Sequence, residues 1–186
     1  MKKATAILAV LMTASCGEVS SEYSTYPCRF VFNMSQHANS AALRSTVGST
    51  GIFCKVTRTM SNQAQYYSFA TNQGLSDKVI LNDIDRQTTI QLGMNNAIYI
   101  GYGNLDNPPV FYAYDGECPN CFDPNAVPVK SRPLKVSSTG IASCAVCHRQ
   151  YNMNTGGNIT AGDKGKPLTR YHASYVSTTG IVAVTN

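Results

Sequence analysis

Two pairs of cysteines, each pair closely spaced in the sequence, constrain the fold of this chain more than any other feature. Cys118 and Cys121 form one C-x-x-C couple, Cys144 and Cys147 form a second, and 22 residues separate the two. Each couple can make a tight turn that directs two sulfurs and nearby backbone N–H groups toward one point. A fold that uses all four sulfurs together must therefore bring two distant loops side by side.

Four thiolates in a tetrahedron suit zinc or iron–sulfur chemistry rather than magnesium or calcium, which prefer oxygen ligands. The spacing therefore predicts one metal centre held by Cys118, Cys121, Cys144 and Cys147. We expect Zn²⁺, with a two-iron two-sulfur (2Fe-2S) cluster or a single iron as alternatives. Two vicinal or crossed disulfides in an exported protein are the other interpretation of the same spacing.

The N-terminus has the pattern of a bacterial lipoprotein signal. A basic pair, Lys2-Lys3, precedes an apolar run from Ala4 to Met12, and Thr13-Ala14-Ser15-Cys16 then supplies small residues that end in a cysteine. The apolar run is too short to span a bilayer, so it reads as a targeting segment rather than a transmembrane helix. We expect residues 1–15 to be removed as a signal peptide.

After this cleavage Cys16 would carry the lipid, and residues 16–26 would form a polar tether to the folded domain. Thr13 departs from the Leu, Val or Ile that is usual three residues before such a cysteine, and plain secretion is the alternative. Loss of two signal-peptide lysines changes the formal net charge from +5 to +3. We expect a protein of the bacterial cell envelope that is lipid-anchored to a membrane, on a face that the sequence leaves open.

The composition favours strands and turns. Charged residues make up 13 % of the chain, against about 25 % in a typical soluble protein, and Tyr, Ser, Thr, Asn and Gly supply the polarity instead. No cluster of lysines and arginines indicates nucleic-acid binding. No paired carboxylates and no Ser-His-Asp arrangement are visible, so we identify no catalytic residues and no small-molecule substrate, and do not expect an enzyme acting by itself.

The chain is predicted to be all-β, because short runs rich in Val, Ile, Tyr, Phe and Thr alternate with Gly, Asn, Asp and Pro. Only Ser40–Ser45 has helical composition. The predicted strands are Cys28–Asn33, Gly51–Thr57, Ala64–Ala70, Asp77–Leu81, Thr88–Leu92, Asn96–Gly101, Val110–Tyr114, Leu168–Tyr171, Tyr175–Ser177 and Gly180–Thr185.

The cysteine region differs from this pattern, because residues 116–162 are rich in Pro and Gly. A long loop-rich segment between strands needs something other than an apolar core to order it, and a metal held by two cysteine couples would do so. Elsewhere, Cys28 and Cys54 lie in strand-like runs. We expect either a disulfide between these two in an oxidising envelope or two buried free thiols on neighbouring strands.

The cysteine loops resemble those of a Rieske iron–sulfur domain. Tyr112-Ala-Tyr-Asp115-Gly-Glu-Cys118-Pro119 is similar to the strand and first cluster-binding loop, and Cys144-Ala-Val-Cys147-His148-Arg149-Gln150-Tyr151 is similar to the second. Gly162 and then Leu168-Thr-Arg-Tyr171 match the Rieske ending. The resemblance covers Ile98 to Val184.

This resemblance implies a Rieske-like antiparallel β-sandwich with a rubredoxin-like or zinc-ribbon-like metal-binding subdomain. The domain would span residues 27–186, with the metal-binding loops within 116–162. Rieske loops offer Cys-x-His and Cys-x-x-His, whereas this chain has Asn120 at the first histidine position and Cys147 at the second. Cys121 and Cys147 would thus be substitute ligands, and two cysteines on each loop match a rubredoxin or zinc-ribbon site.

Two further residues belong to the predicted site as possible outer-shell groups. His148 would hydrogen-bond a ligand sulfur or lie exposed in its loop, and Tyr151 stands where Rieske domains place an aromatic whose hydroxyl donates to a cysteine sulfur. The expected function is a binding or interaction module ordered by zinc. The alternative is an electron-transfer protein that holds iron and serves a membrane-associated oxidoreductase through a protein redox partner; four thiolates would then lower its potential relative to a histidine-ligated Rieske centre.

Overall fold

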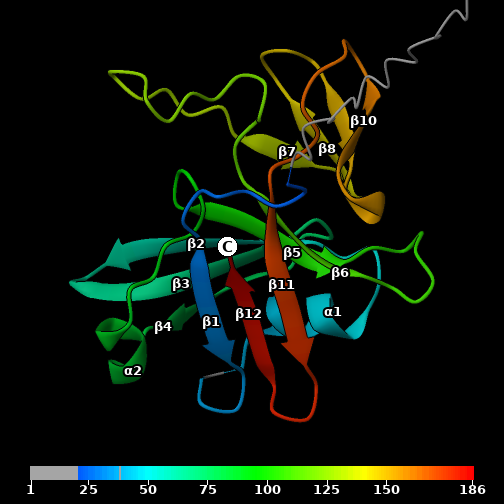
Figure 1. Cartoon of the computed structure of the whole chain (residues 1–186). Helices are drawn as coiled ribbons and strands as arrows, with labels where there is room; N and C mark the ends of the chain where they lie inside the picture. Colours follow the sequence, from blue (N-terminus) through cyan, green and yellow to red (C-terminus); the bar gives the residue numbers. More distant parts are fainter. Residues whose placement is uncertain (1–20, 38) are drawn as a thin grey trace, which may run out of the picture.

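The computed structural model describes residues 21–186 except residue 38, so the predicted signal peptide and Cys16 lie outside the described residues. Figure 1 shows a large sheet that forms the body of the molecule and a small sheet at one end of it. All strand pairings within the two sheets are antiparallel, which confirms the all-β prediction.

The large sheet has the order β1-β12-β11-β6-β5-β2-β3-β4, and its strands are β1 (Arg29–Asn33), β2 (Cys54–Ser61), β3 (Ala64–Thr71), β4 (Ser76–Ile80), β5 (Ala97–Tyr102), β6 (Phe111–Asp115), β11 (Arg170–Val176) and β12 (Ile181–Thr185). This sheet curls so that its two ends face each other. Phe30 and Phe32 of β1 meet Tyr67 of β3 edge-on, with ring centroids 5.4 and 5.6 Å apart. The two layers of the predicted sandwich thus belong to one continuous sheet.

The small sheet has the order β10-β9-β8-β7, and its strands are β7 (Leu134–Val136), β8 (Ile141–Cys144), β9 (Gln150–Asn152) and β10 (Asn158–Ala161). A 3₁₀ turn, η1 (Met153–Thr155), joins β9 to β10. The sequence predicted none of these strands, because three- and four-residue strands among turn formers carry no periodic signal. The small sheet packs through Leu134, Ala142 and Tyr151 against buried tyrosines of β5 and β6.

Two helices complete the described fold, α1 (Ala41–Gly48) and α2 (Asp83–Gln87). The Ser40 hydroxyl caps α1 by accepting a hydrogen bond from the Leu43 amide and donates to the Asp77 carboxylate of β4, which ties the helix to the sheet. The predicted strand Thr88–Leu92 is wrong, because Gln91 makes only an isolated bridge to Arg29. No helix among residues 21–37 and 39–186 is long and apolar enough to cross a membrane.

Residues 21–26 lie against the domain, where the sequence predicted part of a tether. The Ser24 amide donates to the Arg170 carbonyl at 2.8 Å, Glu22 forms an ion pair with the Arg170 guanidinium, and the Tyr23 ring stacks on His172 at 3.8 Å. We call residues 21–26 the N-terminal strap. The described part of the predicted tether 16–26 thus contacts the domain, and its first half lies outside the described residues.

A buried carboxylate, Asp115, joins the large sheet to the segment that leads to the first cysteine loop. Asp115, at the end of β6, accepts hydrogen bonds from the Met94 amide (2.7 Å), the Glu117 amide (2.8 Å) and the Tyr171 hydroxyl (2.8 Å). Burial raises the pKa of the Asp115 carboxyl, and these three donors oppose the rise. These hydrogen bonds therefore fix the position of the chain at Asp115, from which it continues toward Cys118.

We predict opposite effects from removing two buried tyrosine hydroxyls. The Tyr67 hydroxyl is buried and has no hydrogen-bond partner among the described residues, so Tyr67→Phe should leave the free energy of unfolding unchanged or raise it by about 1 kcal/mol. Tyr171→Phe should lower it by about 1–3 kcal/mol, because Asp115 loses a donor. Urea unfolding measures both. A loss in Tyr67→Phe as large as in Tyr171→Phe would contradict the prediction.

Candidate metal centre

The four predicted ligand sulfurs form one compact group. The Sγ atoms of Cys118, Cys121, Cys144 and Cys147 all lie within 4.8 Å of one another. The two contacts between couples are 3.7 Å for Cys118–Cys147 and 3.9 Å for Cys121–Cys144. Sulfurs at tetrahedral positions around one ion, each bonded at about 2.3 Å, lie about 3.8 Å apart. The group therefore has the size that one tetrahedral ion requires.

The first couple lies in a turn just after β6. The Cys118 carbonyl accepts from the Cys121 and Phe122 amides at 3.2 and 2.9 Å, which folds the chain into a tight loop. Farther along, the loop returns so that the Cys118 amide donates to the Arg132 carbonyl at 2.9 Å. Residues 118–132 thus form one closed loop, which extends to the side of the molecule in Figure 1.

The second couple lies in a matching turn between β8 and β9. The Cys144 carbonyl accepts from the His148 amide at 3.0 Å, and the Val146 amide points at the Cys144 sulfur at 3.4 Å. His148 closes this turn with a left-handed backbone, φ 58°. Both couples therefore make the kind of turn that aims sulfurs and backbone N–H groups at a metal, as the spacing predicted.

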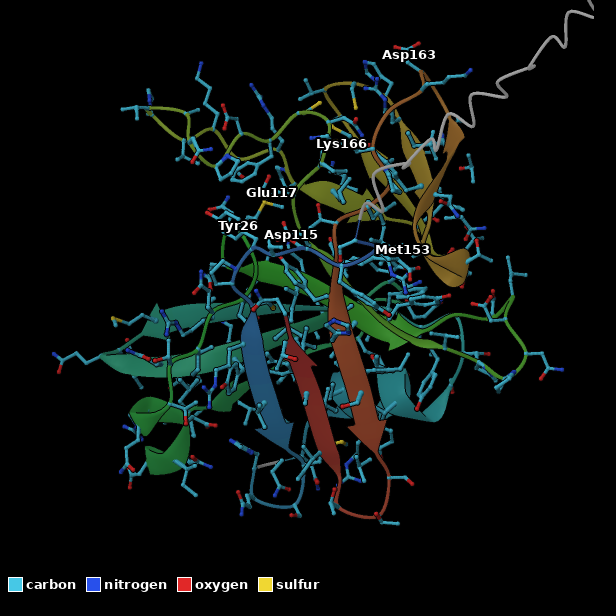
Figure 2. All side chains as sticks on the ribbon, in the orientation of Figure 1. Tyr26, Asp115, Glu117, Met153, Asp163 and Lys166 are labelled. Atoms are coloured by element: carbon cyan, nitrogen blue, oxygen red, sulfur yellow. The ribbon has the colours of Figure 1, made fainter. Side chains whose placement is uncertain are left out.

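Glu117 fixes the base of the first cysteine loop, where residues 118–132 leave and rejoin the rest of the structure. Its buried carboxylate accepts hydrogen bonds from the Asn95 amide group, the Ser131 hydroxyl and the Arg132 backbone N–H. Ser131 and Arg132 lie at the returning end of the loop 118–132, and Asn95 lies just before β5. Glu117, which directly precedes the loop, therefore fixes where the loop leaves and returns. Figure 2 shows Glu117 and Asp115 together at the junction between the two sheets.

Tyr151 of β9 lies behind the sulfur group, as the sequence predicted. Its side chain is fully buried, and its hydroxyl lies 3.4 Å from the Cys118 sulfur. Asn120 donates from Nδ2 to the same hydroxyl at 2.9 Å. Because this bond occupies the phenol oxygen as acceptor, the Tyr151 proton is left to donate to Cys118, and such a bond stabilises a thiolate or a metal–sulfur bond.

Asn120 and Arg149 attach a third segment, residues 163–166, to both cysteine loops. Asn120 accepts from the Lys166 amide at 2.9 Å and donates to its carbonyl at 2.8 Å. Arg149 donates to the carbonyls of Asp163 and Lys164 at 3.0 and 3.1 Å. A Cβ on Gly165 would come within 2.4 Å of the Asn120 side-chain oxygen, so this close approach requires glycine.

Sequence reasoning did not identify Glu117, Asn120 and Arg149 as parts of the site. A signal was available for two of them. Glu117 is an acid directly before a ligand cysteine in a chain with few charges, and Asn120 stands inside a C-x-x-C couple. The role of Arg149 depends on residues 163–166, and no local pattern places that segment beside it.

Burial and hydrogen bonding give the thiols of the sulfur group different pKa values. Burial raises the pKa of Cys118, and burial and the neighbouring thiols raise that of Cys121 to about 12. Burial also opposes ionisation of Cys147, but hydrogen bonds from the Arg149 backbone and guanidinium outweigh it and lower the pKa of Cys147 to about 6. In the metal-free chain, the Cys147 thiol thus ionises before those of Cys118 and Cys121.

The other predicted residues lie elsewhere. His148 has an exposed side chain and does not belong to the sulfur group, so its predicted contact with a ligand sulfur is wrong and the exposed alternative holds.

Cys28 and Cys54 are free and buried, and the predicted bridge between them is not formed. They are not on neighbouring strands, since β1 and β2 lie far apart in the sheet order. Burial raises the pKa of Cys28 to about 11 and that of Cys54 to about 12, which keeps both thiols neutral at pH 7.

The chain matches no family model, and no curated protein and no solved structure is significantly similar to it. The sulfur group is therefore the feature of this chain from which a function can be inferred.

Cys147 should be the first cysteine alkylated in metal-free protein. Thiolate is the nucleophile, so its iodoacetamide rate should rise as pH increases through about 6 and level off near pH 7, while Cys121 stays slow. Peptide mass spectrometry after short exposures measures this order. In Arg149→Ala the inflection of Cys147 should move to higher pH. Equal rates for Cys121 and Cys147 at pH 7 would refute this order.

Proposed function

We propose that this chain is a lipid-anchored protein of the bacterial cell envelope, in which one Zn²⁺ orders a Rieske-like β domain that serves as a binding or interaction module. The observation that carries the metal part is the group of four sulfurs within 4.8 Å. A four-sulfur donor set fits zinc or iron and fits neither magnesium nor calcium. When bound, zinc would supply a fixed cross-link between the two cysteine loops.

The compactness of the sulfur group supports one ion rather than a two-iron cluster. In a 2Fe-2S cluster two cysteines bind each iron, so sulfurs on different irons lie farther apart than sulfurs that share one ion. Here even the widest Sγ–Sγ separation is within 4.8 Å. A single tetrahedral ion accounts for this spacing, and zinc is favoured over a single iron because it keeps one oxidation state in an envelope of variable redox conditions.

The Rieske-like and lipid-anchored parts of the proposal have separate support. Each cysteine couple follows a strand, β6 for the first and β8 for the second, and an aromatic hydroxyl lies on the Cys118 sulfur as in the Rieske pattern. In this proposal the small sheet corresponds to the rubredoxin-like subdomain that the resemblance implies. The lipid anchor depends on the signal pattern that ends at Cys16.

An electron-transfer role with a single iron is the second candidate, and one observation favours it. Cys121 and Cys147 are only half-buried, whereas Cys118 and Cys144 are buried, so two sulfurs reach the surface where a redox partner could approach. Four thiolate ligands would give such an iron a low potential.

Metal analysis should distinguish these candidates. Full-chain protein, purified without a metal-binding tag, should contain one zinc per chain and show no absorbance above about 300 nm, because Zn²⁺ is d¹⁰. A brown or red protein with one or two irons per chain would support electron transfer instead. Protein without zinc or iron, but with cysteines in crossed disulfides, would remove the metal centre from the proposal.

Replacing one ligand should release the metal and loosen only the metal-binding end. In Cys144→Ser we expect no stoichiometric zinc and faster amide hydrogen exchange within residues 118–132 and 144–166, with β2 and β3 still protected. Cys28→Ser is the matched control, because the same chemical change is made at a buried cysteine outside the sulfur group, and it should keep its zinc. Unchanged protection of both loops in Cys144→Ser would show that the metal is dispensable for order.

A further inference from the structure

A hollow of about 600 Å³ lies where the N-terminal strap meets the small sheet. Glu22 of the strap, Tyr112 of β6, Thr155 of η1, Asn158 of β10 and Arg170 of β11 contribute to its lining. A volume of this size is typical of sites that bind small organic molecules. None of the lining residues belongs to the sulfur group, so the hollow is separate from the metal centre.

The guanidinium of Arg170 is the one positive group in this lining. Its side chain is 12 % exposed, and the rings of Tyr23 and Tyr112 lie 5.1 and 5.0 Å from its central carbon. Its ion-pair partner among the described residues is Glu22, through one contact between Nη1 and Oε1. The Arg170 Nε is buried and has no hydrogen-bond partner in the described part of the chain. Because a guanidinium can hold two carboxylate oxygens at once, the binding capacity of Arg170 is only partly used.

Glu22 holds this guanidinium weakly. Its side chain is 64 % exposed, and an ion pair with so exposed a partner contributes little to stability. Two other contacts of the strap remain when the Glu22 side chain turns into solvent. The Ser24 amide donates to the Arg170 carbonyl at 2.8 Å, and the Tyr23 ring stacks on His172. The Glu22 carboxylate can therefore be replaced while the strap stays in place.

We infer that this hollow binds a small organic acid whose carboxylate takes the place of the Glu22 carboxylate on Arg170. The ligand carboxylate would bind the guanidinium through both oxygens, and polar groups of the ligand would meet Thr155 and Asn158. Glu22 is then an internal competitor that keeps the guanidinium paired in the absence of a ligand. This binding site goes beyond the proposed function and does not depend on which metal the four sulfurs hold.

Charge balance selects a single carboxylate as the ligand group. Arg170 and Glu22 are the charged residues of the lining, and Asp106 lies next to it, since its carboxylate accepts a hydrogen bond from the Tyr112 hydroxyl at 2.6 Å. Replacing Glu22 by one ligand carboxylate leaves this balance unchanged. A phosphate would add negative charge beside Asp106, and a neutral ligand that displaced Glu22 would leave a largely buried guanidinium without a counter-ion.

Titration of matched acids and neutral analogues into the full chain tests this inference. The probes are N-acetylalanine with N-acetylalaninamide, and D-glucuronate with D-glucose, so that each pair compares a carboxylate with an uncharged group. NMR follows the Arg170 Nε–H resonance and the backbone amides of Thr155 and Asn158. We expect at least one acid to shift these resonances and its neutral analogue to leave them unchanged. No shift with either acid at about 10 mM, or equal shifts with acid and analogue, would overturn the inference.

Removing the internal competitor should strengthen binding of the acid. In Glu22→Gln the apparent affinity should rise about ten-fold, as expected if Glu22 occupies the guanidinium about nine-tenths of the time. Asp83→Asn is the matched control, because it removes a carboxylate that is 92 % exposed, in α2 and outside the hollow, and it should leave the affinity unchanged. An unchanged affinity in Glu22→Gln, or an equal gain in Asp83→Asn, would contradict the role of Glu22 and overturn the inference.

A change at Arg170 tests the receptor group itself. Combined with Glu22→Gln, Arg170→Lys keeps the positive charge but loses the planar pair of donors, so it should weaken acid binding about ten-fold. The amide spectrum of β2 and β3 shows whether this variant is folded, and a folded variant that binds the acid as tightly as Glu22→Gln alone would refute the site. If the variant does not fold, the acid–analogue pairs and Glu22→Gln decide the question. Inorganic phosphate that binds Glu22→Gln more tightly than both acids would overturn the choice of a carboxylate ligand.

Discussion

The approach of four sulfurs from two loops is the constraint on which the metal-binding end depends. Cys118 and Cys121 leave the large sheet at β6, whereas Cys144 and Cys147 belong to the small sheet, yet all four sulfurs lie within 4.8 Å. Like thiolates repel, so four of them stay this close in ionised form only when a cation lies between them. Three side chains hold the two loops in this arrangement by hydrogen bonds to backbone groups. They are Glu117, Asn120 and Arg149.

Buried tyrosines of the large sheet attach the small sheet to it by packing and by hydrogen bonds. The Tyr99 hydroxyl of β5 donates to the Leu134 carbonyl, and the Tyr114 hydroxyl of β6 donates to the Met153 carbonyl, both at 2.9 Å. Each ring thus adds buried apolar area to one sheet and a hydrogen bond to the other. The two sheets thus meet through buried rings that end in a polar atom.

The sequence predicted what depends on local pattern and missed what depends on distant contacts. Strand-forming composition identified β1 and β5, and spacing identified the four ligands, because both signals lie within a few neighbouring residues. The split of β11 into two predicted strands arose at His172–Ser174, where no strongly apolar residue interrupts the polar run. Arg149 could not be assigned a role, because its partners at residues 163 and 164 come near it only in the folded chain.

With a lipid on Cys16, the N-terminal strap would determine from which side the domain is held. Glu22 and Ser24 attach the chain to Arg170, at the start of β11, and Ser21 and Glu22 border the same hollow as Thr155 and Leu168 beside the small sheet. The turn that follows β11 lies at the opposite end of the molecule (Figure 1). Five residues of fully extended chain, the distance from Cys16 to Ser21, reach about 18 Å at most. A lipid on Cys16 would therefore hold the domain close to the bilayer by the side on which the strap meets Thr155 and Leu168, with the turn between β11 and β12 directed away from it.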